Sequence, residues 1–330
     1  MNFIGRSVAS LRQQSSTHAL HIFVVDDNSS DGTAQTLRCA VTDSTHGARV
    51  RVISGRPLPP GWSGKLWAVQ QGIEQASQLN PEFFLLTDAD IEHAPDNIAR
   101  LAAIANEGGY DLLSFMVKLH CRSLAEKLLI PAFVFFFLLL YPPRWIRDPR
   151  RKTAGAAGGC MLIRPEALNR AGGIAAIRHE IIDDCALGRR MKTQGPIWLG
   201  LTERATSLRP YETVEAIGRM VSRSAYAQLG YSIWVLIGVL AGMILTYVAP
   251  PVAAVIGTGW MRACGAAAWT LMAVSFLPMA RFYRVSPLWG VALPLIGATY
   301  TLFTLQSAIQ VWRGQGGMWK GRAQAKAGGA

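Results

Sequence analysis

Apolar and polar positions in the first part of the chain alternate between short apolar runs and helical spacings. Residues 19–25, 50–54 and 83–86 are largely apolar runs typical of buried strands. Residues 4–11 and 65–79 carry apolar side chains at helical spacing. Strands that alternate with helices predict an α/β layer with a mostly parallel sheet, whose ligands bind beyond the carboxyl ends of the strands.

Long uncharged stretches dominate the last third of the chain. A bilayer core needs about 20 apolar residues of helix, and three stretches meet this length. They lie near residues 232–255, 263–280 and 288–311. The pattern therefore predicts a first domain at residues 1–215 and a membrane domain with about three transmembrane helices at residues 216–330.

A shorter apolar stretch, residues 128–143, lies inside the first domain and ends in two prolines. Its apolar part is too short to span a bilayer, so we expect an interfacial or re-entrant helix, with a buried core helix as the alternative. The cations that follow it at residues 144–152 could hold anionic lipid headgroups.

The charge distribution sharpens this division. The chain has 33 basic and 21 acidic residues, a net charge of +12. All 21 acidic groups and 24 of the basic ones lie in residues 1–215, which leaves only +3 there. The excess therefore flanks apolar stretches, which excludes a nucleic-acid partner, since such a partner needs clustered cations and aromatics on a soluble face. Five cysteines without a C-x-x-C pair predict buried thiols in a reducing compartment.

Three aspartate clusters supply the candidate chemistry. The first, Asp26-Asp27 with Asp31, follows the strand at 19–25 and precedes a short helix expected at 33–39. The second is Asp88-Ala89-Asp90, after the strand at 83–86. Asp-x-Asp at a strand end suits a hard cation such as Mg²⁺ or Mn²⁺ that neutralises a departing diphosphate, with a simple acidic turn as the alternative.

The third cluster, Asp183-Asp184, precedes a helical stretch. Paired acids there could supply a general base for attack by a hydroxyl group, or could merely cap the helix. His93 follows the second cluster, but it has no ligand spacing, so we expect a surface or supporting role for it.

The order and spacing of these motifs over residues 4–211 resemble family 2 inverting glycosyltransferases. The matching motifs are the turn at 26–33, Gly64-Lys65, Asp88-Ala89-Asp90, the glycine-rich segment 155–159, Gly172-Gly173, and Asp183-Asp184-x-x-Leu187-x-x-Arg190. The stretches 62–68, 118–121, 148–153 and 319–322 more narrowly resemble the hopanoid-biosynthesis-associated branch of that family.

The resemblance implies a GT-A fold, a UDP-sugar donor and a divalent metal. It implies that Asp27 contacts the nucleoside and that Lys65 lies near the donor. Asp88 and Asp90 would face the diphosphate and Mg²⁺ or Mn²⁺, with Asp90 as the better metal ligand.

On the acceptor side, the resemblance makes Asp184 the general base, with Asp183 beside it. Membrane-bound relatives often carry Q-x-x-R-W after the base, and the resemblance implies a diphosphate-binding role for Arg223, although Arg223 is the only residue of that motif present here. Arg190 is expected to orient the helix.

The beginning of the chain departs from the family pattern. Family members begin with a strand and a Pro-x-Arg-Asn-Glu-like turn, whereas this chain starts inside the following helix. The resemblance places the absent strand between those ending at Asp26 and Asp88, so we expect a GT-A sheet lacking its first strand, with unpaired backbone groups on both neighbours. We hypothesise a truncated gene model.

Together these patterns predict a multi-pass glycosyltransferase of the cytoplasmic (inner) membrane, with its catalytic domain facing the cytoplasm. It would transfer a sugar, with inversion, from a UDP-sugar to a lipid hydroxyl, and a hopanoid is the first choice of acceptor. Ceramide-like and polyprenyl-phosphate acceptors are alternatives, and proteins of a lipid-synthesis assembly are candidate partners. The rival reading is an inactive membrane protein that kept the aspartates.

Overall fold

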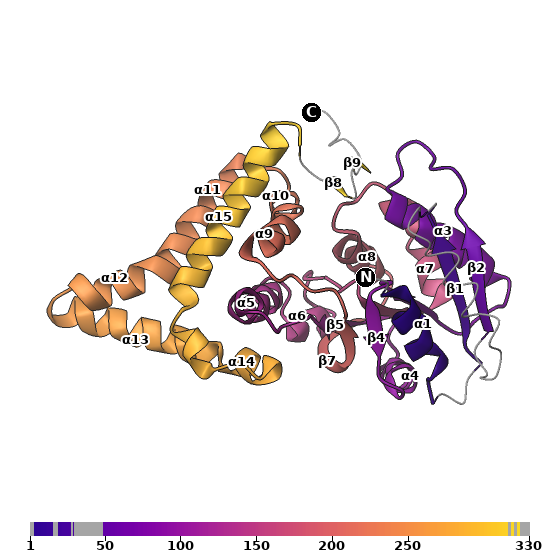
Figure 1. The fold of residues 1–330 in the computed structure, drawn as a ribbon, viewed down its shortest axis with the longest axis horizontal. Helices are drawn as coiled ribbons and strands as arrows, with labels where there is room; N and C mark the ends of the chain where they lie inside the picture. Colours follow the sequence, from indigo (N-terminus) through magenta and orange to yellow (C-terminus); the bar gives the residue numbers. More distant parts are fainter. Residues whose placement is uncertain are drawn as a thin grey trace. The chain divides into compact units, whose positions relative to one another are not determined.

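The computed structural model describes residues 3–15, 19–27, 29, 49–315, 318–319 and 322–323, and the helix expected at 33–39 lies outside them. The chain divides into two compact units (Figure 1). The first unit comprises residues 1–119, 141–209 and 324–330, and the second comprises residues 120–140 and 210–323.

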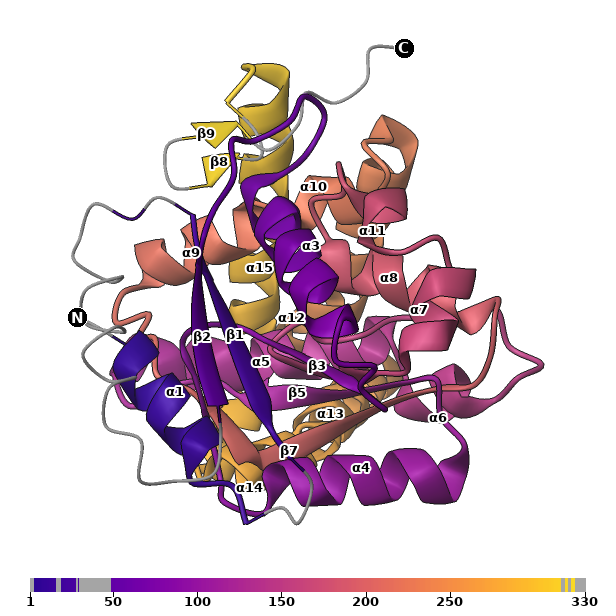
Figure 2. The ribbon, with the colours of Figure 1, turned by 90° about the vertical axis from the view of Figure 1, so that its right-hand side faces the viewer.

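The first unit is an α/β structure with two sheets (Figure 2). In the smaller sheet, β1 (His21–Asp26) pairs in parallel with β2 (Arg49–Ser54). The larger sheet has the strand order β3-β6-β5-β7-β4. Its strands are β3 (Phe84–Thr87), β4 (Ile91–His93), β5 (Leu112–Lys118), β6 (Cys160–Ile163) and β7 (Ile197–Ser207).

The larger sheet is mixed, so the expectation of a mostly parallel sheet is wrong. Only β5 and β7 run parallel, while the pairs β3–β6, β5–β6 and β4–β7 are antiparallel. All four residues of β6 are buried, and a short apolar run of this kind does not indicate whether the strand pairs in a parallel or an antiparallel direction. Its pairing with β3 and β5 is set by segments far away in the chain.

Helices cover these sheets, and the two expected helices that lie within the described residues are confirmed. The helices of the first unit are α1 (Ile4–Arg12), α3 (Gly64–Ser77), α4 (Asn97–Gly108), α6 (Pro143–Arg147), α7 (Pro165–Arg170), the 3₁₀ helix Ile174–Ile177 and α8 (Asp183–Lys192). α1 and α3 match the helices expected at 4–11 and 65–79, and β1, β2 and β3 match the expected strands. β1 and β3, which carry the first two aspartate clusters at their ends, belong to different sheets, and α3 contacts both.

The second unit is mostly helical. Its helices are α5 (Leu124–Leu140), α9 (Val214–Ser222), α10 (Ala225–Gln228), α11 (Ile233–Met243), the π-helical turn Ile244–Val248, α12 (Ala249–Ile256), α13 (Gly259–Ser275), α14 (Leu277–Tyr283), the 3₁₀ helix Pro287–Gly290 and α15 (Leu293–Trp312). A short pair, β8 (Met318–Trp319) and β9 (Arg322–Ala323), follows. The π turn ends two residues before Pro250-Pro251, where the missing N–H donors interrupt the α-helical hydrogen bonds.

Three helical segments among the described residues are long and apolar enough to cross a membrane. They are Leu124–Arg147, Ile233–Ile256 and Gly259–Tyr283. The second and third agree with the spans expected at 232–255 and 263–280. The stretch expected at 288–311 forms α15, which is helical but not one of these three candidates.

The first candidate span corrects the sequence-based estimate for residues 128–143, because the helix begins earlier than the apolar run. Ser123 and Glu126 form a capping box: Glu126 N donates to Ser123 Oγ (3.1 Å), and Ser123 N donates to Glu126 Oε2 (2.9 Å). The fully buried Glu126 also accepts hydrogen bonds from Arg122 N and Tyr211 N. This cap extends the helix over polar residues that the hydropathy pattern excludes.

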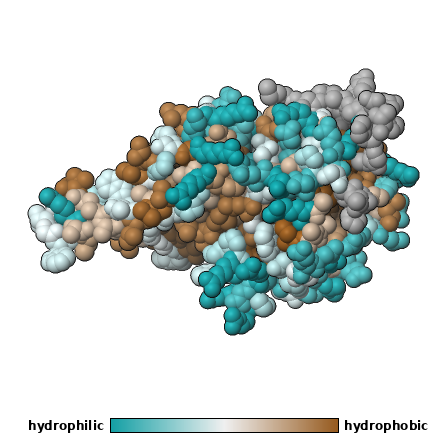
Figure 3. All heavy atoms as spheres, turned by 90° about the horizontal axis from the view of Figure 1, so that it is seen from below, coloured by the Kyte–Doolittle hydropathy of each residue, from teal (hydrophilic) through white to brown (hydrophobic). Residues whose placement is uncertain are grey.

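Many large apolar side chains of the second unit are exposed. Trp260 is 86% exposed and Trp234 is 78% exposed, although burial of apolar surface is the main driving force in folding. Brown, hydrophobic side chains are visible on the face shown in Figure 3. Apolar surface of this extent marks a membrane or protein interaction site.

Candidate active site

The central feature of the site is a lysine that pairs with aspartates from two different clusters. Lys65 Nζ lies 3.0 Å from Asp183 Oδ2 and 3.4 Å from Asp88 Oδ1. The second and third clusters are separated by more than 90 residues in the chain, yet one cation contacts both. The Lys65 and Asp88 side chains are 37% and 42% exposed, so a ligand can reach this group from solvent.

Local structure explains why these three side chains meet. Asp88 follows β3 directly, and Asp183 is the first residue of α8. Lys65 is the second residue of α3, whose N-cap Ser63 accepts a hydrogen bond from Leu66 N. The backbone N–H of Ser63 donates to Arg178 O (2.9 Å), which ties the start of α3 to the chain that leads into α8. Two helix N-termini, which favour negative charge, therefore border the site.

The electrostatic balance of the group favours a charged lysine. Burial by itself lowers the pKa of Lys65, but attraction by Asp183, Asp88 and Asp184 outweighs it, so the pKa lies above its ordinary value. Lys65 is thus a permanent cation at neutral pH. It offsets part of the repulsion among the surrounding carboxylates.

Asp184 is held in one orientation by two backbone donors. Its Oδ2 accepts from Gly158 N (2.8 Å), and its Oδ1 accepts from Cys185 N (2.7 Å). Burial and the neighbouring Asp183 raise the pKa of Asp184, Lys65 and the two N–H donors oppose this rise, and the net pKa is about 6. A carboxylate with such a pKa is ionised at neutral pH and is more basic than an ordinary aspartate, which suits proton abstraction.

Asp90 does not share the lysine but pairs with an arginine that the sequence analysis did not identify. Arg209 Nε lies 2.9 Å from Asp90 Oδ2. Burial raises the pKa of Asp90, Arg209 opposes that rise, and Asp88 adds to it. No motif marks Arg209 in the sequence. Its only signal is a cation placed two residues after the end of a strand, since β7 ends at Ser207.

The first aspartate cluster is only partly described, since Asp31 lies outside the described residues. Asp26 closes a local turn by accepting from the backbone N–H of Ser29 (3.1 Å). Asp27 lies beside the start of α3, because a Cβ added at Gly64 would come within 3.2 Å of Asp27 Oδ2. Asp27 and Lys65 therefore lie around the same helix N-terminus. Arg223 belongs to the second unit, and its expected role stays a prediction.

Asp88 and Asp90 fit a hard divalent cation by the chemistry of their donor set. Mg²⁺ is commonly bound by one or two carboxylates together with substrate phosphates and water. In the described part of the chain, no three His, Cys, Asp or Glu side chains gather in a way that could hold a metal ion. Donor phosphates and water would supply the remaining ligands.

His93 supports the structure beneath this site. It is 3% exposed, not a surface residue, and its Nε2 lies 3.0 Å from Thr87 Oγ1 while its Nδ1 lies 2.9 Å from Asn97 Nδ2. Burial lowers the pKa of His93 to about 4, so the ring is neutral at physiological pH. It anchors the strand that delivers Asp88.

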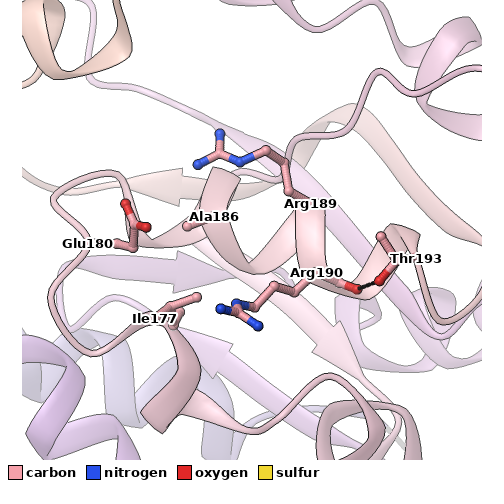
Figure 4. A pocket seen from close by; sticks show the side chains of 6 residues that line it. All are labelled: Ile177, Glu180, Ala186, Arg189, Arg190 and Thr193. Carbon is pink, nitrogen blue, oxygen red and sulfur yellow. Dashed lines mark hydrogen bonds between the residues drawn. The ribbon is translucent and has the colours of Figure 1, made fainter. Parts of the chain in front are cut away.

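An open cavity of about 380 Å³ lies beside α8 (Figure 4). Its lining residues are Ile177, Glu180, Ala186, Arg189, Arg190 and Thr193. Arg190 extends toward Ile177 in this view, away from Arg189. The six residues include none of the candidate aspartates.

Close packing at Gly188 holds α8 against the glycine-rich segment, and this contact provides a stability test. A Cβ at Gly188 would lie 2.9 Å from Gly155 C and 3.1 Å from Ala156 N, both backbone atoms. We expect Gly188→Ala to destabilise the protein by about 1–3 kcal/mol, as overpacking does. The thermal unfolding midpoint measures this effect.

Gly5→Ala is the matched control for that measurement. Gly5 lies within α1, and a Cβ there would meet nothing within 4 Å. The control should be neutral or stabilising by up to about 1 kcal/mol, because alanine favours the helix. Equal unfolding midpoints for the two variants would contradict the proposed packing constraint.

Comparisons with known proteins identify the family of the chain and its fold. The sequence profile of the family described as Glycosyl transferase family 2 matches residues 2–172, more than half of the chain. The mannosyltransferase PcManGT from Pyrobaculum calidifontis, solved in complex with GDP-Man and Mn²⁺, superposes with a TM-score of 0.54 at 17% identity, over 94% of this chain and 84% of that one. TarS 1–349 from S. aureus in complex with UDP gives a TM-score of 0.43 at 14% identity, over 95% and 89% of the two chains.

Among curated proteins, no sequence shows a significant match to the chain. The likeness to PcManGT supports the fold, a family 2 α/β glycosyltransferase fold with a mixed sheet. The family profile covers α1 to α7, including Lys65, Asp88 and Asp90. The chain therefore belongs to glycosyl transferase family 2 and is a glycosyltransferase that takes its sugar from a nucleotide sugar.

Proposed function

We propose that this glycosyltransferase is membrane-bound and metal-dependent, and that it transfers a sugar from a UDP-sugar to a lipid hydroxyl with inversion. The observation that carries the proposal is the double ion pair of Lys65 with Asp88 and Asp183. It joins Asp88, one of the two carboxylates assigned to the donor diphosphate, to the helix that begins with the acid pair. One cation thus contacts a carboxylate assigned to the donor and the carboxylate next to the proposed base.

On the donor side, Asp88 and Asp90 would hold Mg²⁺ or Mn²⁺, and Asp27 would contact the nucleoside. The bound metal supplies positive charge that neutralises the departing diphosphate. Lys65 adds a fixed cation beside Asp88. The Mn²⁺ in PcManGT supports a divalent metal, although that protein holds GDP-Man and we assign UDP by the sequence resemblance.

On the acceptor side, Asp184 removes the proton of the attacking hydroxyl. The hydroxyl oxygen forms a bond to the anomeric carbon while the bond from that carbon to the diphosphate oxygen breaks, and its electron pair leaves with the diphosphate. Because attack comes from the face opposite the leaving group, the configuration inverts. The two backbone donors to Asp184 keep its carboxylate in place for this proton transfer.

The second unit supports a lipid acceptor. It contains exposed apolar helices, and two of the three candidate spans lie wholly within it. Such helices would hold the enzyme in the inner membrane, with the catalytic unit at the cytoplasmic surface. By resemblance, a hopanoid is the first acceptor to test, and ceramide and polyprenyl phosphate are the next.

The test is transfer of radiolabelled sugar by the full chain in nanodiscs, with several UDP-sugars and with hopanoid, ceramide and polyprenyl-phosphate acceptors. We expect label in the lipid fraction, with the opposite anomeric configuration to the donor. We also expect transfer to stop on chelation and to return with Mn²⁺ or Mg²⁺. Transfer only to water-soluble acceptors would overturn the lipid assignment, and chelator-resistant transfer would overturn the metal assignment.

A further inference from the structure

A compact basic surface with one exposed tryptophan lies in the first unit, immediately after the α5 helix. We call residues 143–152 the Trp145 patch. The patch contains five cations and one aspartate, a net charge of +4 within ten residues. Its members are α6 and the turn that follows, and its cations are Arg144, Arg147, Arg150, Arg151 and Lys152.

The tryptophan and the cations of the patch are exposed to solvent, and local contacts hold them in place. Trp145 is 46% exposed, and the Arg151 guanidinium lies over its ring at 5.0 Å from the centroid. Arg150 is 88% exposed while its backbone N–H donates to Asp148 Oδ1 (2.9 Å), which fixes the turn. Ile146, by contrast, is fully buried and anchors α6. The patch is therefore a fixed surface with outward cations.

The patch is tied to the same elements that hold Asp184. Lys192, the last residue of α8, hydrogen-bonds through Nζ to the carbonyl oxygens of Ile146 and Asp148 (2.9 Å for the latter). Tyr141 packs on the glycine-rich segment, since a Cβ at Gly155 would come within 2.5 Å of its ring. Asp184 accepts from Gly158 of that segment and lies about 12 Å along α8 from Lys192, at 1.5 Å per residue.

We propose that the Trp145 patch docks on anionic lipid headgroups at the bilayer surface. Leu139 and Leu140, 56% and 59% exposed, come directly before the patch within the candidate span Leu124–Arg147. Tryptophan is enriched at membrane interfaces, and clustered cations beside a span attract anionic headgroups. An acidic peptide or a nucleic acid would match the charge but not the adjoining apolar helix.

The consequence for catalysis rests on the proposed function. Because the Trp145 patch is bonded to the C-terminal end of α8, its docking on the lipid would hold Asp184, at the other end of α8, at a fixed distance from the lipid surface. An acceptor hydroxyl that projects from the membrane would then meet the base without leaving its leaflet.

The test is hydrogen–deuterium exchange of residues 143–152 in the full chain, in nanodiscs of phosphatidylcholine with and without phosphatidylglycerol. We expect anionic lipid to slow exchange at least about tenfold, since each cation near an anionic surface contributes about fivefold to binding. R144Q/R147Q/R151Q should lose this protection, and R144K/R147K/R151K should keep it. Because exchange does not depend on turnover, this result is independent of the sugar-transfer assay.

The matched control removes three exposed arginines elsewhere on the first unit, in R49Q/R51Q/R100Q. It should retain the lipid-dependent protection of residues 143–152. Equal exchange in neutral and anionic nanodiscs would overturn the proposal, and so would equal loss of protection in the control. If protection is seen but no sugar is transferred to lipid, the docking stands and only the proposed acceptor fails.

Discussion

Asp184→Asn is expected to lower kcat for sugar transfer by about 10²–10⁴-fold, the usual contribution of general acid–base catalysis. Asparagine has nearly the same shape, but its single amide oxygen can accept from only one of the backbone N–H groups of Gly158 and Cys185, and it cannot take up a proton. The affinity for the nucleotide sugar should change little. Single-turnover transfer and donor titration together measure the two quantities.

The control for this variant is Asp96→Asn. Asp96 is half exposed and pairs with Arg204 at 2.6 Å, a surface ion pair of small energetic value. It should keep wild-type kcat. Equal transfer by wild type and Asp184→Asn would show that Asp184 is not the base.

The pH profile adds a signature specific to a base. Asp184 acts only when ionised, and its pKa is raised to about 6, mainly by burial and by Asp183. The wild-type kcat should therefore fall as pH drops through about 6 and should reach a plateau above it. The residual activity of Asp184→Asn should lack this acid limb.

The sequence predicts much of the site because its signals are local. Each aspartate cluster follows a recognisable strand or begins a helix, and Lys65 follows the N-cap Ser63. Those features are set by neighbouring residues, so their elements are predictable from a single chain. The direct pairing of Lys65 with both Asp88 and Asp183 is the part that only the fold supplies.

The missed features depend on distant contacts. Arg209 pairs with Asp90 across 119 residues, and nothing near Arg209 in the sequence marks it as a partner. The antiparallel pairing of β6 with β3 and β5 is likewise non-local. The early start of α5 was missed for a different reason: the Ser123 and Glu126 cap is a local signal, but it lies among polar residues that a hydropathy pattern excludes.

Lys65→Gln is expected to lower kcat/KM by about 10²–10³-fold, comparable to the loss of one preorganised electrostatic group. Removal of this cation leaves Asp88, Asp183 and Asp184 without the charge that offsets their repulsion. It also removes a fixed positive group beside the carboxylates assigned to the diphosphate. Initial rates at varied donor concentration measure the loss, and Lys65→Arg, which keeps the charge, should recover part of it.

The pH dependence of kcat tests whether Lys65 acts electrostatically on the base. Burial and Asp183 raise the pKa of Asp184, and Lys65 lowers it, so loss of the cation must move that pKa upward. In Lys65→Gln the acid limb of kcat should therefore shift to higher pH, while Lys65→Arg should leave it close to wild type. A lysine that only braced α3 would lower activity without moving the limb. An unshifted acid limb in Lys65→Gln would therefore show that Lys65 does not affect the pKa of the base. It would contradict the proposed electrostatic coupling between the donor and acceptor carboxylates.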